Sequence, residues 1–172
     1  MRNFFLVLAA LLPLSLAAQQ PVVLHSHNDY NRTAPFWEAY SQHCRSIEAD
    51  VHWHDGQLLV GHDVEDLKPE NTFLRMYVDP IVRTFRANGG KMWAGSPDRL
   101  MLMVELKSPT EPELSEVIKL LEQFPDVFCS PDGVQISIPA TPRPRSISAT
   151  IPPGWVMTET SATTTPRSSW SA

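Results

Sequence analysis

The 172-residue sequence contains little cysteine and no excess of positive charge. Its two cysteines, Cys44 and Cys129, lie far apart and give neither a disulfide framework nor a zinc signature, so we expect isolated, partly buried thiols. The 14 basic residues are outnumbered by 19 acidic ones, for a formal net charge of -5. The composition therefore gives no sign of a basic surface that would bind nucleic acid.

Long apolar runs are also scarce, because only the first residues form one. Residues 4–16 are almost wholly apolar, follow an early positive charge, and precede two alanines and a polar break. That pattern is typical of a secretory signal peptide. The run is shorter than the ~20 residues that span a bilayer, and Pro13 and Ser15 interrupt it. We expect residues 1–18 to be a signal peptide and the protein to be exported (periplasmic or secreted), with no transmembrane segment after cleavage.

Strand-like and helix-like patterns alternate across residues 19–138. Residues 46–53 alternate apolar and polar side chains, which is typical of a strand, and Asp55-Gly56 is typical of a hairpin turn. Residues 100–107 form an almost continuous apolar run, as expected for a strand buried on both faces. This order predicts an α/β fold with a parallel sheet. We expect further strands at 22–25, 57–63 and 133–138, and helices at 35–42, 72–90 (with a break at Pro80) and 108–125.

The pattern changes after residue 138. Residues 139–172 contain scattered Pro, Thr, Ser and Arg without sustained periodicity. Such a segment cannot bury enough apolar surface to offset its ordering entropy, so we expect a disordered tail. One hypothesis is that the tail is an out-of-frame translation, because a frame shifted by two bases permits an ordinary loop-and-helix sequence. A natural low-complexity tail is the alternative.

Carboxylates stand near the ends of two predicted strands. Glu48 and Asp50 are two residues apart on one strand, so their side chains point the same way. Adjacent carboxylates repel each other unless a cation or a proton lies between them. With Glu105 from another strand, they form a set of oxygen ligands suited to a divalent metal ion such as Ca²⁺ or Mg²⁺. A solvated strand face is the alternative.

Two histidines and a lysine lie at neighbouring strand ends. His27 and His62 could act as general base and general acid, because imidazole titrates near neutral pH. Lys107 follows Glu105 on the same face and could hold a phosphate oxygen. A single histidine is more often a surface or capped core residue. Together with the E-x-D and E-x-K patterns, these residues indicate a site at which a metal ion neutralises a phosphodiester.

The segments HSHNDY (25–30), SIEADVHWHDGQLLVGHD (46–63) and VELK (104–107) resemble the superfamily of glycerophosphodiester phosphodiesterases and phosphatidylinositol-specific phospholipases C. Within it, they resemble the branch that includes altered inheritance of mitochondria protein 6. The resemblance covers roughly residues 22–138 and implies a (β/α)₈ barrel that acts on a small-molecule or lipid-headgroup phosphodiester. It implies His27 and His62 as catalytic residues, Glu48, Asp50 and Glu105 as metal ligands, and Asn28 and Lys107 as substrate or metal contacts.

Some residues depart from the pattern of that superfamily. Asn28 stands where the glycerophosphodiesterases have a phosphate-binding arginine, so their substrate cannot be transferred to this protein. His25 is an alternative to His27, which we prefer because Asn28, Asp29 and Tyr30 follow it. We expect His52 and His54 to be exposed.

The length raises a further expectation. A (β/α)₈ barrel normally takes ~250 residues, whereas this sequence supplies about four strands before its pattern ends. We therefore expect the N-terminal portion of a barrel, truncated after about four strands, and a chain that lacks activity by itself. Two alternatives to a hydrolase stay open. One is a non-catalytic module that binds a phosphorylated ligand or a sugar, and the other is a lyase that forms cyclic phosphates.

Overall fold

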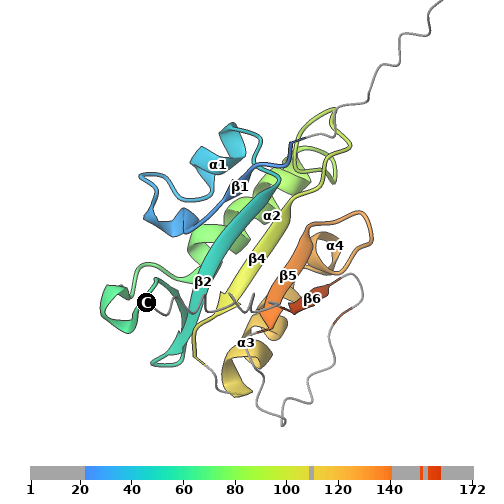
Figure 1. The fold of residues 1–172 in the computed structure, drawn as a ribbon. Helices are drawn as coiled ribbons and strands as arrows, with labels where there is room; N and C mark the ends of the chain where they lie inside the picture. Colours follow the sequence, from blue (N-terminus) through green and yellow to red (C-terminus); the bar gives the residue numbers. More distant parts are fainter. Residues whose placement is uncertain (1–21, 109–110, 141–151, 153–154, 160–172) are drawn as a thin grey trace, which may run out of the picture.

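The computed structural model describes residues 22–108, 111–140, 152 and 155–159; the expected signal peptide at residues 1–18 lies outside them. One sheet and the helices that pack on it make up the described part of the chain (Figure 1). The strands are β1 (His25–Ser26), β2 (Ser46–His54), β3 (Gln57–Val60), β4 (Met101–Leu106), β5 (Gln135–Ala140) and β6 (Val156–Glu159). The α-helices are α1 (Trp37–Ser41), α2 (Asp79–Ala87), α3 (Glu111–Leu121) and α4 (Pro125–Phe128).

The strand order is β1-β2-β4-β5-β6, and all of these neighbours are parallel. β3 is antiparallel to β2 and shares an edge of β2 with β1. On that edge β1 pairs with residues 46–47 and β3 with residues 51–54, while β4 pairs with residues 46–51 along the other edge. The expected α/β fold with a parallel sheet is thus confirmed. The arrangement is compatible with part of an α/β barrel. Closure into an eight-stranded barrel and truncation of that barrel after about four strands stay predictions.

The alternation of β2 separates a core face from a polar face. Ile47, Ala49 and Val51 are fully buried in the hydrophobic core that the helices cover. Each large apolar side chain buried there contributes about 1.5–3 kcal/mol to folding. Glu48 and Asp50 therefore point to the opposite side of the sheet.

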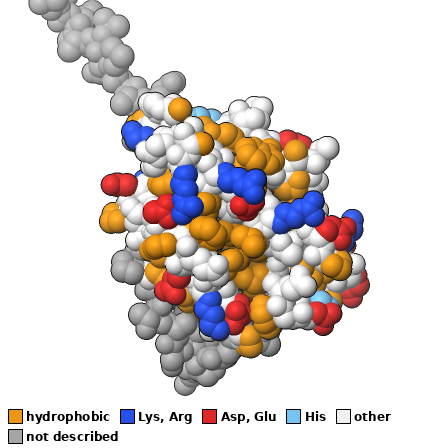
Figure 2. Space-filling model, turned by 180° about the vertical axis from the view of Figure 1, so that it is seen from behind, with side chains coloured by type: hydrophobic (Ala, Val, Ile, Leu, Met, Phe, Trp, Pro, Cys, Tyr) orange, Lys and Arg blue, Asp and Glu red, His pale blue; other side chains and the backbone are white. Residues whose placement is uncertain are grey.

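Figure 2 shows the molecule from behind, where apolar side chains alternate with Lys, Arg, Asp and Glu and no single sign of charge dominates.

The expected break at Pro80 is instead a change of helix type. Residues Leu74–Val78 form a π-helical turn that runs directly into α2, and Pro80 lies at the start of α2. Proline is tolerated there because the first N–H groups of an α-helix have no partner within it. The helix therefore continues, and its side chains Tyr77, Ile81 and Phe85 are all buried.

Part of the expected tail is ordered as a strand. β6 pairs in parallel with β5, and Trp155 just before it is 9% exposed. The indole Nε1 of Trp155 donates a hydrogen bond of 2.9 Å to the Phe128 carbonyl oxygen. The remainder of residues 139–172 lies outside the described residues, apart from the end of β5 and residue 152. The out-of-frame hypothesis stays a hypothesis.

Two further expectations concern the described residues. Cys44 and Cys129 are free and partly buried, as expected. In the described ranges, no helix is long and apolar enough to cross a membrane.

Candidate functional site

Three carboxylates meet on the polar face of the sheet. Glu48 and Asp50 are 2% and 1% exposed, so the alternative of a solvated strand face is wrong. Glu105 on β4 is the direct neighbour of Asp50 in the parallel register. One oxygen from each of the three side chains lies within 4.8 Å of the others. Burial of such a set is costly unless cations balance it.

The two oxygens of Asp50 have different surroundings. Oδ2 lies 2.8 Å from Lys107 Nζ, 2.8 Å from the Tyr30 hydroxyl and 3.1 Å from His62 Nδ1. Oδ1 is buried and has no hydrogen-bond partner among the described residues. A buried carboxylate oxygen without a donor is costly. A carboxylate oxygen in this state can accept a further donor or a cation.

Lys107 supplies a positive charge to this set. Its ammonium group lies 3.0 Å from Glu105 Oε1 as well as close to Asp50, and its side chain is 17% exposed. Partial burial lowers the pKa of Lys107, but the hydrogen bonds to Asp50 and Glu105 outweigh this and raise it above its ordinary value. The ammonium form therefore persists, and three carboxylates against one ammonium leave an excess of negative charge.

The β2–β3 hairpin returns His62 to the site. β3 runs back along the end of β2, and Gly61 donates a backbone hydrogen bond to the Asp50 carbonyl oxygen. The next residue, His62, then reaches Asp50 with its ring. His52 was expected to be exposed, but it is 4% exposed, and its Nε2 lies 3.1 Å from the Gly61 carbonyl oxygen. It shares the face of Glu48 and Asp50 and fixes the hairpin that presents His62.

Tyr30 belongs to the site although the sequence analysis assigned it no role. Its hydroxyl donates to Asp50 and lies 3.2 Å from His62 Nδ1 and 3.1 Å from Asn28 Oδ1. Burial, followed by the neighbouring Asp50, raises the pKa of Tyr30 far above its ordinary value, so the group remains a hydroxyl. The available signal was its position in HSHNDY, two residues after the expected contact residue Asn28.

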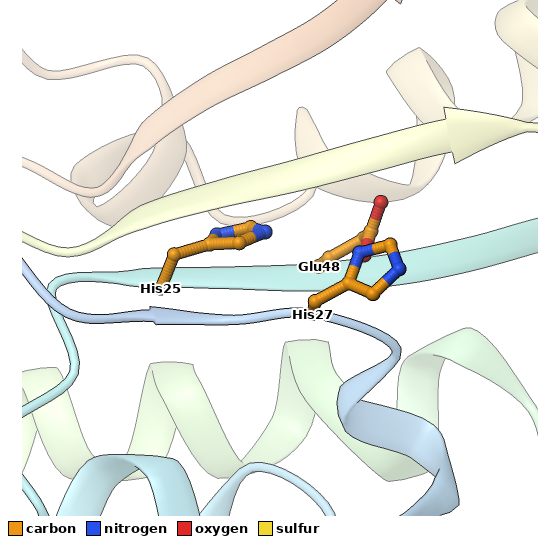
Figure 3. Close-up of side chains that lie close together, drawn as sticks. All are labelled: His25, His27 and Glu48. Carbon is orange, nitrogen blue, oxygen red and sulfur yellow. The ribbon is translucent and has the colours of Figure 1, made fainter.

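His27 follows β1 and approaches Glu48 from the end of that strand (Figure 3), and Asn28 is the next residue in the chain. His27 Nδ1 lies 2.5 Å from Glu48 Oε2, and the His27 side chain is 71% exposed. Asn28 adopts a left-handed backbone conformation, φ 47° and ψ 47°, which asparagine tolerates better than most residues. The backbone N–H of Asn28 donates to the same Glu48 oxygen at 2.8 Å. His25 instead places its Nδ1 2.8 Å from Ser46 Oγ.

A buried aspartate holds the loop that carries these groups. Asp29 is fully buried and accepts hydrogen bonds from Ser26 Oγ (2.7 Å), the Phe36 backbone N–H (2.6 Å) and the Tyr77 hydroxyl (3.1 Å). These donors come from β1, the start of α1 and the π-helical turn. Asp29 therefore fixes Asn28 and Tyr30, its two neighbours in the chain, relative to the sheet.

The structure thus brings together all seven residues that the sequence analysis named for the site. A cavity of about 330 Å³ is lined by His62 and Tyr30 of the site and by Lys68 and Asn71 among others. Glu65 and Asp66 also line it, so the cavity is polar and carries charges of both signs. It lies beside Tyr30 and His62 and offers space for a polar group next to these two side chains.

The chain is similar in sequence to curated proteins from fungi. The chain is 31% identical over 124 residues to the altered inheritance of mitochondria protein 6 homolog of Arthroderma benhamiae, a match that covers 62% of this chain and 40% of that protein. It is 33% identical over 98 residues to altered inheritance of mitochondria protein 6 of Eremothecium gossypii, covering 49% of this chain and 25% of that protein. The chain thus spans less than half the length of these two curated relatives.

No solved structure gives a significant match to the chain. A family model described as an AIM6-like phosphodiesterase domain matches residues 15–126, which is more than half of the 172 residues. The chain therefore belongs to the family of AIM6-like phosphodiesterase domains.

Proposed function

We propose that the site around Asp50 hydrolyses a phosphodiester with the help of one divalent metal ion. The observation that supports this most directly is that Oδ1 of Asp50 is buried without a hydrogen-bond partner among the described residues, while Asp50 itself clusters with Glu48 and Glu105. Around it stand two histidines and a lysine, the groups needed for proton transfer and for contact with phosphate. The barrel fold expected for the superfamily is part of the same proposal, as is export by the leader at residues 1–18.

The donor set fits Mg²⁺ or Ca²⁺. Both ions prefer oxygen ligands, and the charge of the three carboxylates exceeds that of the Lys107 ammonium beside them. Glu48, Asp50 and Glu105 would hold the ion, which would offset the negative charge of the phosphodiester when bound. Lys107 keeps Oδ2 of Asp50 occupied, so Oδ1 is the oxygen left for a metal ion.

The two histidines divide the proton transfers. Hydrolysis adds water to phosphorus and breaks the bond from phosphorus to the leaving alcohol. One imidazole accepts the proton of the attacking water, and the other donates a proton to the departing oxygen. His27 and His62 suit these roles because carboxylates two residues apart on β2, Glu48 and Asp50, hold their Nδ1 atoms and leave Nε2 to face the substrate.

The substrate is a small-molecule or lipid-headgroup phosphodiester. The cavity of about 330 Å³ beside Tyr30 and His62 would take the alcohol portion. Its lining of Lys68, Asn71, Glu65 and Asp66 favours a polar alcohol that bears hydroxyl or charged groups.

Metal titration tests the proposal without requiring turnover. Isothermal titration of Mg²⁺ or Ca²⁺ into the 172-residue chain should show binding that Glu105→Gln weakens at least about 10-fold, since a direct ligand matters at least as much as an outer-shell partner. Glu116→Gln, an exchange on the surface of α3, is the matched control and should bind as the parent does. Failure of the parent chain to bind either ion would overturn the proposal.

Turnover is a separate question. We expect the isolated chain to be inactive, so EDTA-sensitive release of p-nitrophenolate from bis(p-nitrophenyl) phosphate would contradict that expectation while supporting the function. In a chain with turnover, His62→Ala should abolish catalysis and leave ligand affinity unchanged. Unchanged turnover in that variant would favour the non-catalytic binding module for this site. Phosphorus NMR of the product separates hydrolysis from the cyclising lyase reaction.

A further inference from the structure

A second group of possible metal ligands lies next to the carboxylate site. His25 and His27 at β1 and Glu48 on β2 each offer one ligand atom, and these atoms lie within 4.8 Å of one another. Figure 3 shows the two imidazole rings beside Glu48 above the first strands of the sheet. We propose that these three side chains bind a borderline transition-metal ion such as Zn²⁺, at a site that overlaps the carboxylate site through Glu48.

The ligand types separate the two sites chemically. Two imidazole nitrogens and one carboxylate oxygen form a set that suits Zn²⁺, whereas Mg²⁺ and Ca²⁺ prefer ligands that are all oxygen. Zn²⁺ bonds of about 2.0–2.1 Å place tetrahedral ligand atoms about 3.3 Å apart. The contact of 2.5 Å between His27 Nδ1 and Glu48 Oε2 must therefore open slightly. The His27 side chain is 71% exposed and can move outward.

Hydrogen bonds already orient two of the three ligands. His25 Nδ1 lies 2.8 Å from the hydroxyl of Ser46, which is 3% exposed. A proton on Nδ1 that is donated to this hydroxyl leaves the lone pair of Nε2 free for an ion. The Asn28 backbone N–H donates a hydrogen bond to Glu48 Oε2 and so orients that carboxylate. Such outer-shell partners are typical of zinc ligands, because they fix the ring orientation and the tautomer.

The position of His25, His27 and Glu48 determines how a metal ion reaches them and which function its binding affects. His25 and His27 are exposed while Glu48 is buried, so an ion reaches the group from solvent and keeps an open coordination position. An ion bound to His27 occupies a nitrogen of the imidazole that the proposed function uses for proton transfer. Inhibition by Zn²⁺ follows, and this consequence rests on the proposed function, whereas the site itself does not.

Zinc titration of the 172-residue chain tests the site. Calorimetry with Zn²⁺ alone should give one equivalent of binding that His25→Ala weakens at least about 10-fold. His54→Ala removes an exposed histidine on β2 outside the group and should retain the parent affinity. Ser46→Ala keeps all three ligands but removes the partner of His25, and we expect a loss of about 10–100-fold. Thermal melts of each variant check that it is folded.

Several outcomes would overturn the site: no zinc binding to the parent, equal affinities for the parent and His25→Ala, or an equal loss for His54→Ala. Loss of zinc binding in Glu105→Gln with full binding in His25→Ala would place the ion at the carboxylates instead. In a chain with Mg²⁺-dependent turnover, Zn²⁺ should inhibit the parent and spare His25→Ala. Absence of turnover in the isolated chain is the expected result and does not bear on the zinc site, because the calorimetric result decides the site.

Discussion

The Tyr30 hydroxyl donates a hydrogen bond of 2.8 Å to Oδ2 of Asp50, so the loop after β1 is joined directly to a carboxylate of β2. The same hydroxyl lies 3.2 Å from His62 Nδ1, which links the loop to the hairpin that follows β2. Three segments that are distant in the sequence are therefore joined at one oxygen atom. The position of His62 depends on Tyr30 as well as on Asp50.

Tyr30→Phe tests this dependence. Loss of the hydroxyl removes one donor from Asp50 and one neighbour from His62, so divalent-metal affinity should fall about 10–100-fold, as for other outer-shell partners. The free energy of unfolding should fall by only about 1 kcal/mol, the usual contribution of one hydrogen bond. Tyr40→Phe is the control, because its hydroxyl donates to the Met92 carbonyl oxygen at 2.9 Å, away from the site. Equal metal affinities for the two variants would contradict the role of Tyr30.

Lys107→Met tests whether the ammonium and a metal ion share the task of balancing the carboxylates. Without metal, the variant should lose about 2 kcal/mol of stability in urea denaturation, since charged hydrogen bonds are lost next to Asp50 and Glu105. Saturating Ca²⁺ or Mg²⁺ should restore most of this loss, because the dication replaces the missing charge. If metal does not change this loss of stability, the Lys107 ammonium and the metal ion do not share the task of balancing the carboxylates. Lys119→Met, which removes an exposed lysine paired with Glu116, should cost less than about 0.5 kcal/mol.

The sequence was sufficient to place the carboxylates on one face, because strand alternation depends only on local spacing. It also predicted the hairpin at Asp55-Gly56 that returns His62 to Asp50. The same alternation places His52 on the face of Glu48 and Asp50. The prediction that His52 is exposed was wrong, because its burial depends on the hairpin that covers it.

Other parts of the fold and site depend on contacts that local patterns do not encode. The pairing of Asp50 with Glu105 is set by the register between β2 and β4. The reach of Tyr30 depends on a short 3₁₀ turn at Asp29–Asn31. β6 is only four residues long and is ordered by pairing with β5, so it carries no periodicity of its own.

Asp29→Asn should destabilise the protein strongly. The buried carboxylate accepts from three donors, and an amide presents an NH₂ group where an acceptor is needed. We expect a loss of about 2–4 kcal/mol in the free energy of unfolding, measured by urea denaturation. Tyr77→Phe removes only one of these donors and should cost about 1 kcal/mol. Equal losses for both variants would contradict the view that Asp29 holds the whole loop.

Glu113 predicts a dependence of stability on pH. Burial raises the pKa of Glu113 to about 7, although the backbone N–H groups of Ser108 and Trp53 act in the opposite direction. Because the folded pKa exceeds the unfolded value, this group stabilises the fold below about pH 4.5, and that stability is lost as pH rises through about 7. The change has an upper limit of about 3 kcal/mol.

Urea denaturation of the parent and of Glu113→Gln at several pH values between 4 and 8 measures this effect. The glutamine variant should show a flatter profile over that range. Parallel profiles for the two proteins would assign the pH dependence to other groups.

The hairpin described above also affects the order in which the site forms during synthesis. His27, Tyr30, Glu48, Asp50 and His62 all precede β4 in the chain and are synthesised before it, and the contacts among them need no residue of β4. The nascent chain can therefore build one half of the cluster first and receive Glu105 and Lys107 when the next parallel strand docks beside β2.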